Sequence, residues 1–378
     1  MFRLLRYLRG EKMAIFTDVF EDVTKQGRKI PTSDYHETGI YPIIDQGQSE
    51  IAGFTDETDG LFTDVPAIIF GDHTRVLKYV DTPCFLGADG VKLLKARIPN
   101  PNYKYLYYAL SSADIPNTGY NRHFKWLKAV DIPLLDADEQ QTIVDVLDKI
   151  SELITLRKEQ LAKLDQLVKS RFIELFGDLH STNFPKCKMA DVCGIKHGYA
   201  FSGEFFTEVD NNILLVTPGN FKVGGGFQEK KCKFFTGEYS KEYVLNGGDL
   251  IVTMTDLSKN MDTLGYSAIV PHTDRVYLHN QRIGLFVNVS VKINRVFLMH
   301  FMQTNEYRDN IIASATGSTV HHTSPSKILD CEMFVPPIEL QNQFVAFVEQ
   351  TDKSKLAVQA SLDKLELLKK SLMQEYFG

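Results

Sequence analysis

Residues 160–177 read QLAKLDQLVKSRFIELFG, and residues 361–378 read SLDKLELLKKSLMQEYFG. The two stretches align without a gap at a constant offset of 201 residues, with nine identities in the seventeen positions that begin at Leu161 and Leu362. Solenoid repeats recur about every 20–50 residues, so this longer period is not a solenoid. A shared ungapped register argues against chance likeness of two helices rich in Leu and Lys. It predicts a duplicated module of one domain plus one helix.

Both copies lie within long amphipathic helices. Residues 138–176 contain neither glycine nor proline, and their apolar residues recur at intervals of four and three, with one break at Arg157. This spacing is typical of a coiled coil, and about 38 residues at 1.5 Å each give a rod of roughly 57 Å. Residues 339–376 repeat the pattern, with breaks at Thr351 and Lys355. We expect the two helices to pack on each other, antiparallel if the halves are related by a dyad.

The remaining sequence has the texture of strands and turns. Residues 14–131 and 184–332 contain short apolar runs separated by turn residues such as Asp-Gly and Gly-Asp. We therefore predict an α+β fold with a pseudo-twofold internal repeat: two mixed α/β domains, joined and followed by two long helices that form an antiparallel coiled coil. The predicted boundaries are residues 1–134 and 181–336 for the domains, and residues 135–180 and 337–378 for the helices.

The composition is that of a globular protein, with 43% hydrophobic and 24% charged residues in 378. The sequence has no apolar run of about 18 residues, so no membrane span is predicted. The basic start, MFRLLRYLRGEKM, lacks the apolar segment of a secretory signal. Five cysteines without a Cys-x-x-Cys pair fit free thiols and a cytoplasmic location. The net charge of −6 argues against nonspecific electrostatic binding of nucleic acid by this chain, because such affinity comes from Lys and Arg that neutralise phosphates.

Familiar catalytic motifs are missing from the sequence. It has no phosphate-binding Gly-x-x-x-x-Gly-Lys-Ser/Thr loop, no Gly-x-Ser-x-Gly elbow and no His-Glu-x-x-His pair. Residues 100–103, Asn-Pro-Asn-Tyr, resemble the Asn-Pro-Pro-Tyr of adenine methyltransferases, but the second proline and a glycine loop for the methyl donor are absent. We predict that this run is a turn before the helix YKYLYYALS. His321 and His322 are adjacent, and we expect them to form a recognition or turn element and no metal site.

Polar loops suited to reading bases remain. Arginine pairs with guanine, Asn or Gln with adenine, and Ser or Thr with either. In the first half the candidates for DNA contact are Gln46, Gln48, His73, Thr74, Arg75, Asn121, Arg122, His123 and Lys125. In the second half they are Lys259, Asn260, Asn280, Gln281, Arg282, Ser318, Thr319, His321 and His322.

The chain resembles a known family over most of its length. The stretch from Ile132 to Asp178 resembles the central conserved region of the specificity (S) subunit of type I restriction–modification enzymes, with its Ile-Pro-Leu start, Glu-Gln pair, long helix and Phe-Gly-Asp close. Leu-Leu-Asp stands where the family usually has a Pro-Pro pair, and the distal region lacks Glu-Glu before its glutamine. The other similar stretches are residues 41–57, 70–95 and 118–128 in the first recognition domain, 247–253, 279–286 and 316–322 in the second, and 334–348 with the final Glu-Tyr-Phe-Gly in the distal region.

The resemblance implies a non-catalytic DNA-specificity subunit. In that family each target recognition domain reads one half of a bipartite double-stranded DNA site, while the paired helices set the spacing and dock two methyltransferase subunits. It also implies that this chain binds no cofactor, because AdoMet, ATP and Mg belong to the methyltransferase and restriction subunits. Two other functions stay open: a DNA adenine methyltransferase-like enzyme with an unrecognised site, and a coiled-coil scaffold that binds protein. AdoMet binding by the isolated chain would favour the first of these.

Overall fold

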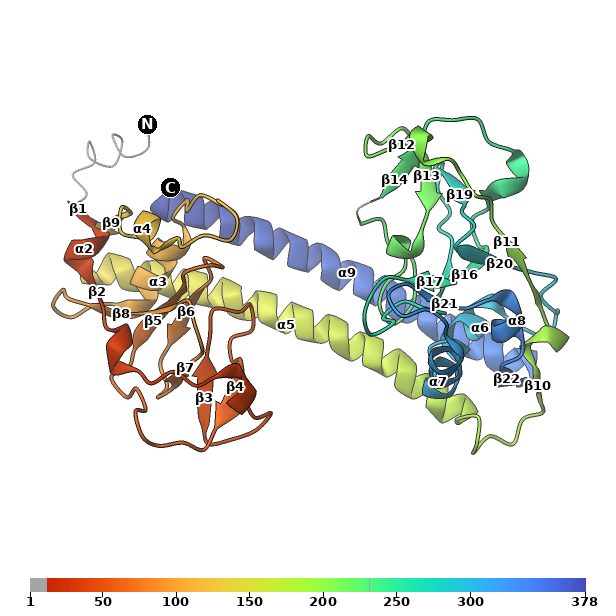
Figure 1. Ribbon diagram of the computed structural model, residues 1–378, viewed down its shortest axis with the longest axis horizontal. Coiled ribbons are helices and arrows are strands. Elements are labelled where there is room, and N and C mark those ends of the chain that lie inside the picture. The colour runs from red at the N-terminus through yellow and green to blue at the C-terminus, as the bar shows by residue number, and fades with distance from the viewer. Residues whose placement is uncertain (1–11, 231) are drawn as a thin grey trace. The chain divides into compact units, whose positions relative to one another are not determined.

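The computed structural model describes residues 12–230 and 232–378, so the basic start at residues 1–11 lies outside the described part. The chain forms two compact units (Figure 1). Unit 1 contains the residues up to 159 together with residues 359–378, and unit 2 contains residues 160–358. Each unit therefore combines one strand-rich block with parts of both long helices.

The two long helices, α5 (Ala137–Phe176) and α9 (Ile338–Phe377), are 40 residues each, and their bounds differ by 201 residues at both ends. Their first turns are held alike. The Gln140 side-chain amide donates to the Leu135 carbonyl at 2.9 Å, and the equivalent Gln341 donates to the Pro336 carbonyl at 2.8 Å. Gly177 follows α5 with a φ of +72°, a left-handed conformation that glycine adopts without a steric penalty. The repeat in sequence is thus a repeat of helix length and of helix ends.

The helices run antiparallel within each unit, which confirms the expectation from sequence (Figure 1). In unit 1 the Lys158 ammonium lies 3.1 Å from the Glu366 carboxylate. In unit 2 the Lys355 ammonium lies 2.7 Å from the Asp165 carboxylate. Asp165 and Glu366 are equivalent in the repeat, so each copy of this acidic residue pairs with a lysine of the opposite helix. Partly exposed pairs contribute about 1 kcal/mol or less, so the packing depends on the apolar stripe.

The apolar faces of the helices complete the core of each unit. In unit 1, Leu147 of α5 lies in the buried cluster with the sheet and α3 (Tyr103–Ser111), and Phe377 of α9 packs against that cluster. In unit 2, Phe172 of α5 and Phe344 of α9 are buried together, with ring centroids 5.3 Å apart. Each long helix therefore belongs to two different cores along its length.

Unit 1 holds a four-stranded antiparallel sheet in the order β2-β8-β5-β6 and a three-stranded sheet in the order β4-β3-β7, in which β3 and β7 are parallel. A further pair, β1 with β9, leads into α5. The strand and short-helix bounds are β1 (Lys12–Ile15), α2 (Phe16–Val19), β2 (Phe20–Asp22), β3 (Tyr41–Ile44), β4 (Gly53–Thr55), β5 (Ala67–Gly71), β6 (Leu77–Val80), β7 (Phe85–Leu86), β8 (Val91–Ala96), α4 (Phe124–Leu127) and β9 (Asp131–Leu134).

Unit 2 repeats this plan. Its four-stranded sheet has the order β11-β20-β16-β18, and the parallel pair β13 with β19 lies in a five-stranded sheet of order β12-β14-β13-β19-β15. The pair β10 with β22 leads into α9 as β1 with β9 leads into α5. The bounds are β10 (Lys186–Lys188), β11 (Gly194–His197), β12 (Phe206–Thr207), β13 (Ile213–Val216), β14 (Lys233–Phe235), β15 (Val244–Leu245), β16 (Leu250–Thr253), β17 (Thr255–Asp256), β18 (Ser267–Ile269), β19 (Val276–His279), β20 (Ile283–Val287), α6 (Arg295–Phe301), α7 (Asn305–Ser314), β21 (His321–His322), α8 (Pro325–Leu329) and β22 (Glu332–Phe334).

An asparagine cap joins each sheet domain to its long helix. Asn102 caps α3 with its side-chain oxygen, and its amide donates to the Gln141 side chain of α5 at 3.3 Å. Asn294 caps α6 in the same way, and its amide donates to the Asn342 side chain of α9 at 3.0 Å. Gln141 and Asn342 are equivalent in the repeat. The run at residues 100–103 is therefore the turn before α3, as predicted.

Within residues 12–230 and 232–378, no helix combines the length and apolar character that crossing a membrane requires.

Candidate nucleic-acid interface

In unit 1 the predicted polar residues lie on loops that the structure brings together. The loop at residues 45–48 follows β3, the loop at 72–75 joins β5 to β6, and the loop at 117–123 precedes α4. The Gln46 side-chain oxygen accepts from the His73 backbone N–H at 3.2 Å, and the Gln46 amide donates to the carbonyl of Asp89 in the β7–β8 connection at 3.1 Å. Residues separated by up to 43 positions thus form one surface.

Asp72 and His123 fasten the last of these loops to the β5–β6 turn. The His123 backbone N–H donates to the Asp72 carbonyl, and the Phe124 N–H donates to the Asp72 carboxylate, each at 2.7 Å. The His123 ring lies within hydrogen-bond distance of the same carbonyl, at 3.0 Å, and of the Thr118 hydroxyl, at 3.4 Å. His123 is fully buried. The structure therefore places it as a support for the loop and withdraws its side chain from any ligand at the surface.

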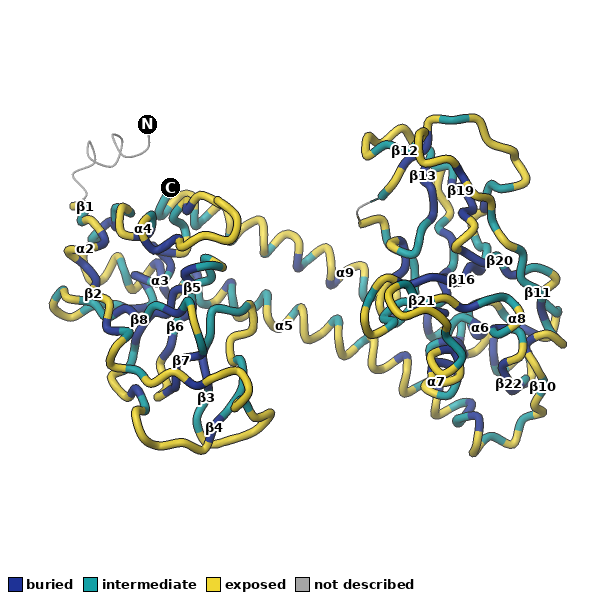
Figure 2. The backbone as a smooth tube through the Cα atoms, in the orientation of Figure 1, coloured by how far each residue is buried: buried dark blue, intermediate teal, exposed yellow. Residues whose placement is uncertain are grey.

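The other predicted residues of unit 1 differ in exposure. The Arg75 guanidinium donates to the Ile115 carbonyl at 3.1 Å, which ties the β5–β6 turn to the segment after α3. The exposed candidates are Gln48, Thr74, Asn121, Arg122 and Lys125, whereas Gln46, His73 and Arg75 are half-buried. The loop ahead of α4 is largely exposed (Figure 2).

Unit 2 also assembles three polar segments, two of which lie at connections equivalent to those of unit 1. The Met254 N–H donates to the Arg282 carbonyl at 2.9 Å, and the Thr323 N–H donates to the Met254 carbonyl at 3.0 Å. The Thr255 hydroxyl lies 3.2 Å from Nδ1 of His322, across the β17–β21 pair. The three segments are residues 254–263, which contain β17 and lie between β16 and β18, residues 280–282, between β19 and β20, and residues 316–323, which contain β21 and precede α8.

The predicted residues of unit 2 are mostly accessible. Asn280 is the buried member: its side-chain oxygen accepts from the Arg282 N–H at 2.9 Å and shapes the β19–β20 turn. His321 is half-buried on β21. The exposed members are Lys259, Asn260, Gln281, Arg282, Ser318, Thr319 and His322.

The buried carboxylate of Asp256 organises the loop that carries Lys259 and Asn260. It accepts from the Ser258 N–H at 2.6 Å, from the Leu264 N–H at 3.0 Å, and from both the N–H and the hydroxyl of Thr263. Burial raises the pKa of this carboxyl, but the backbone and hydroxyl hydrogen bonds outweigh burial and hold the pKa below its ordinary value of 3.8. The ionised Asp256 carboxylate therefore holds the two ends of this loop together through hydrogen bonds.

This lowered pKa predicts acid-sensitive order in the loop. A carboxyl whose pKa is lower in the folded state adds stability above its ordinary pKa and loses it as the pH falls through the folded-state value. We expect amide hydrogen exchange at residues 257–264 to accelerate as the pH drops below 3.8, relative to the intrinsic rate. Asp256→Asn should exchange faster at neutral pH and lack this pH dependence. Equal profiles for both proteins would contradict the role given to Asp256.

Three accessible apolar side chains in or beside these loops are absent from the polar set predicted from sequence. Tyr120 is 87% exposed in the loop before α4, and Leu257 is 72% exposed in the loop after β17. Tyr199 is half exposed, and its backbone pairs with that of Asn280. The available signal was a single aromatic or aliphatic residue within a run of polar turn residues, as in Thr-Gly-Tyr-Asn-Arg.

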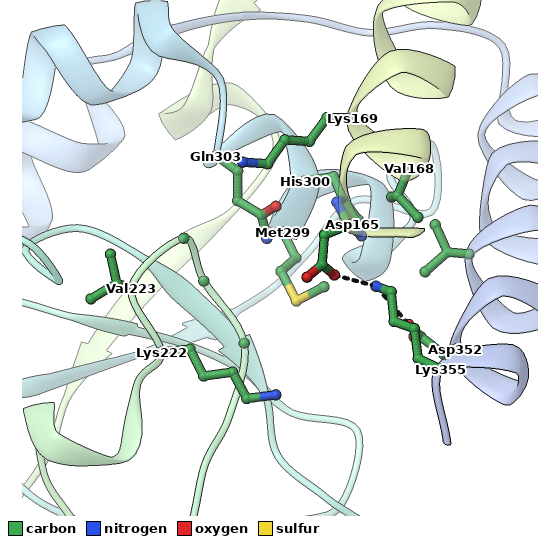
Figure 3. A pocket seen from close by; sticks show the side chains of 14 residues that line it. Asp165, Val168, Lys169, Lys222, Val223, Met299, His300, Gln303, Asp352 and Lys355 are labelled. Atoms are coloured by element: carbon green, nitrogen blue, oxygen red, sulfur yellow. Dashed lines mark ion pairs between the residues drawn. The ribbon is translucent and has the colours of Figure 1, made fainter. Parts of the chain in front are cut away.

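A hollow of about 320 Å³ in unit 2 lies among α5, α6, α9 and the glycine loop at residues 222–226 (Figure 3). The Lys355 ammonium lies 2.7 Å from the Asp165 carboxylate and 3.3 Å from the Asp352 carboxylate, so both carboxylates of the lining are already paired. Burial, together with nearby Lys355, lowers the pKa of His300 to about 4. The hollow thus holds a neutral histidine and a closed ion-pair network, and none of the predicted contact residues lines it. Across the described ranges, His, Cys, Asp and Glu form no group that could hold a metal ion.

Two segments, residues 12–166 and 183–367, match the sequence family described as Type I restriction modification DNA specificity domain. Each segment contains one strand-rich block and most of the long helix after it. The chain belongs to the type I restriction–modification DNA specificity family. The resemblance drawn from the sequence over most of its length is thereby confirmed.

Curated relatives within this specificity family match over parts of their length. The chain is 22% identical to the type I restriction enzyme MjaVIII specificity subunit of Methanocaldococcus jannaschii over 261 residues, which are 64% of this chain and 60% of the relative. It is 29% identical to the EcoR124I/EcoR124II specificity subunit of Escherichia coli over 151 residues, 35% and 37% of the two chains. The chain thus spans less than two thirds of either relative in these matches.

Solved structures share the specificity-family fold. A crystal structure of the type I restriction–modification S subunit from M. genitalium has a TM-score of 0.58 at 15% identity, covering 97% of this chain and 96% of its own. A chain from a structure on complex assembly and conformational transition of the type I system has a TM-score of 0.54 at 14% identity, covering 97% of both. At 14–15% identity these similarities concern the fold alone.

Proposed function

We propose that the chain is the DNA-specificity subunit of a type I restriction–modification complex, without a catalytic role of its own. Residues 1–134 and 181–336 would be its target recognition domains, each reading one half of a bipartite double-stranded site, with residues 135–180 and 337–378 as the helices that fix the spacing. The observation that carries the proposal is the duplicated strand order: in both units a polar loop follows the central strand β5 or β16, and another precedes the short helix α4 or α8. Two readers on one chain suit a split site.

Base reading falls to the exposed members of the predicted sets. Arg122 and Arg282 can each donate two hydrogen bonds to a guanine, and Asn121 and Gln281 can pair with an adenine. Buried His123 and Asn280, and half-buried Gln46 and Arg75, instead hold the loops in place. Loops fixed in this way lose little entropy on binding, which favours selective contact over loose charge attraction.

The positions of the identical residues in the repeat support the binding of two identical partner subunits. Of the nine identical pairs, five are exposed in both copies, and they include Leu167 with Leu368 and Lys169 with Lys370. Buried Phe172 and half-buried Met373, in contrast, occupy equivalent positions and differ. Core packing accounts for the identities of Leu161 with Leu362 and of Phe176 with Phe377, but it gives no reason to keep residues that are exposed in both copies. Retained exposed residues suit two copies of one partner, which we propose to be the methyltransferase subunit.

Leu167 and Leu368 give this partner proposal a sharp test. Their exposed fractions are 48% and 47%, so a charge at either position should leave the fold intact. We expect Leu167→Asp and Leu368→Asp each to copurify with one methyltransferase subunit instead of two, and the double variant with none, because a buried unpaired carboxylate opposes docking. Native mass spectrometry gives the stoichiometry. Leu356→Asp is the matched control. Leu356 is 72% exposed, but its equivalent position in the repeat is Thr155, so this leucine is not shared by the two copies. This variant should keep both partners.

The partner subunits carry the chemistry in this proposal. The methyltransferase subunits bind AdoMet and receive the flipped target adenines, and the restriction subunits use ATP and Mg. Phosphate contacts shared with these subunits would offset the net charge of −6 on this chain. The five free cysteines support action in the cytoplasm, a reducing compartment.

Methylation-sensitive sequencing of the host genome, with and without the gene, tests the proposed function. We expect one split, asymmetric motif with methyladenine on both strands to disappear when the gene is deleted. Restoring the gene should restore the motif. An unchanged methylome, combined with failure of the chain to copurify with a methyltransferase subunit, would overturn the proposal.

A further inference from the structure

We infer that Tyr120 makes an apolar contact with the 5-methyl group of a thymine in the half-site read by the first domain, with His73 as its support. The inference rests on the proposed function and assigns one chemical feature of the DNA to one side chain. It concerns a residue outside the polar set predicted from sequence.

The exposed ring of Tyr120 stacks on the ring of His73. The Tyr120 side chain is 87% exposed, and its ring lies parallel to that of His73, with centroids 4.6 Å apart and planes 8° apart. The imidazole therefore lies against part of one ring face, and most of the tyrosine side chain remains accessible. An isolated exposed tyrosine would sample several rotamers, whereas stacking favours this one.

Both members of the stack are attached to a rigid base. The His73 backbone is held by the Gln46 side chain at 3.2 Å. The loop that carries Tyr120 is held by the paired hydrogen bonds from residues 123 and 124 to Asp72. The Asn121 N–H donates to the Gly119 carbonyl at 2.9 Å, which closes the turn around Tyr120. The accessible part of the ring is thus fixed before any ligand arrives.

The surroundings indicate which part of DNA the ring meets. Exposed Asn121 and Arg122 adjoin Tyr120 in sequence, and both types of side chain read base edges in the major groove. The apolar group that a base pair offers in that groove is the thymine 5-methyl. A preformed aromatic face among base-reading residues therefore matches a thymine. A methylated adenine in each half-site guarantees at least one A·T pair for it to meet.

Deoxyuridine substitution removes that methyl group and tests the contact directly. The probe is a duplex of the split motif, with each thymine of the first half-site replaced in turn by deoxyuridine, bound to the chain in complex with its methyltransferase subunits. We expect one replacement to weaken wild-type binding about four-fold, the effect of one buried methyl group. Tyr120→Ala should bind the normal site about ten-fold more weakly and should be insensitive to the same replacement. Tyr120→Phe, which keeps the ring face, should behave as wild type.

Variants of His73 test whether its ring positions Tyr120 or whether its replacement disturbs the domain in general. His73→Ala should lose the sensitivity to deoxyuridine, and His73→Phe, which restores a flat partner, should recover it. Ile40→Ala is the matched control: Ile40 is 68% exposed in the same unit, at the opposite end of β3 from the polar loop, and this variant should retain wild-type affinity and sensitivity.

The outcomes distinguish this contact from the proposed function. If the wild-type complex binds no split site, both fail. If it binds the site but tolerates deoxyuridine at every position, or if Tyr120→Ala keeps the wild-type response, the function stands and the thymine contact is wrong.

Discussion

Replacing Phe172 by alanine should lower the free energy of unfolding of unit 2 by about 3–5 kcal/mol, the usual effect of deleting a buried aromatic ring. Phe172 is buried, and its ring centroid lies 4.9 Å from that of Phe176, 5.3 Å from Phe344 and 5.6 Å from Phe297. These rings come from α5, α9 and α6. The substitution therefore leaves a cavity where both long helices meet the second sheet domain, and neighbouring rings can fill it only in part.

Urea unfolding of the isolated chain measures this loss. Ile173→Ala is the matched control, because the neighbouring residue on the same helix is 61% exposed. Its effect should stay below about 1 kcal/mol. A loss for Phe172→Ala no larger than that of the control would show that the helix pair does not depend on this aromatic cluster.

Exchanging residues 14–131 for the corresponding block of a family member with another DNA site should rewrite one half of the methylated motif and leave the other half unchanged. Each mismatched base pair weakens specific binding by about 1–3 kcal/mol, so methylation at the original site should fall by roughly 100-fold or more once several pairs change. The reason is structural: the loops of unit 1 are held by contacts within unit 1, such as the one between Asp72 and His123, and an exchanged block carries its own contacts along.

The reciprocal exchange of residues 184–332 is the control, and it should alter the second half of the motif alone. Methylome sequencing reports both halves in one measurement. If either exchange alters both halves, the units do not read independently. If neither alters the motif, the recognition loops lie elsewhere.

The sequence by itself determined the framework of this protein. The 201-residue offset predicted two equal helices, and α5 and α9 have bounds that differ by that number at both ends. The turn before α3 followed from Asn-Pro-Asn-Tyr and the helix YKYLYYALS. These features depend on contacts between residues a few positions apart, so periodicity, caps and turn residues in the sequence report them directly.

Only the tertiary structure decided which polar residues can meet a ligand. His73 and His123 lie in similar polar runs, yet one ring stacks under an exposed tyrosine and the other is buried against Asp72, 51 residues away. The shared strand order of the two units was likewise hidden, because their side chains have diverged. Strand pairing and loop assembly join residues that are distant in sequence, and many side-chain combinations satisfy the same backbone ladder. The local pattern therefore fixes where strands and helices form, while packing decides which of their loops share a surface.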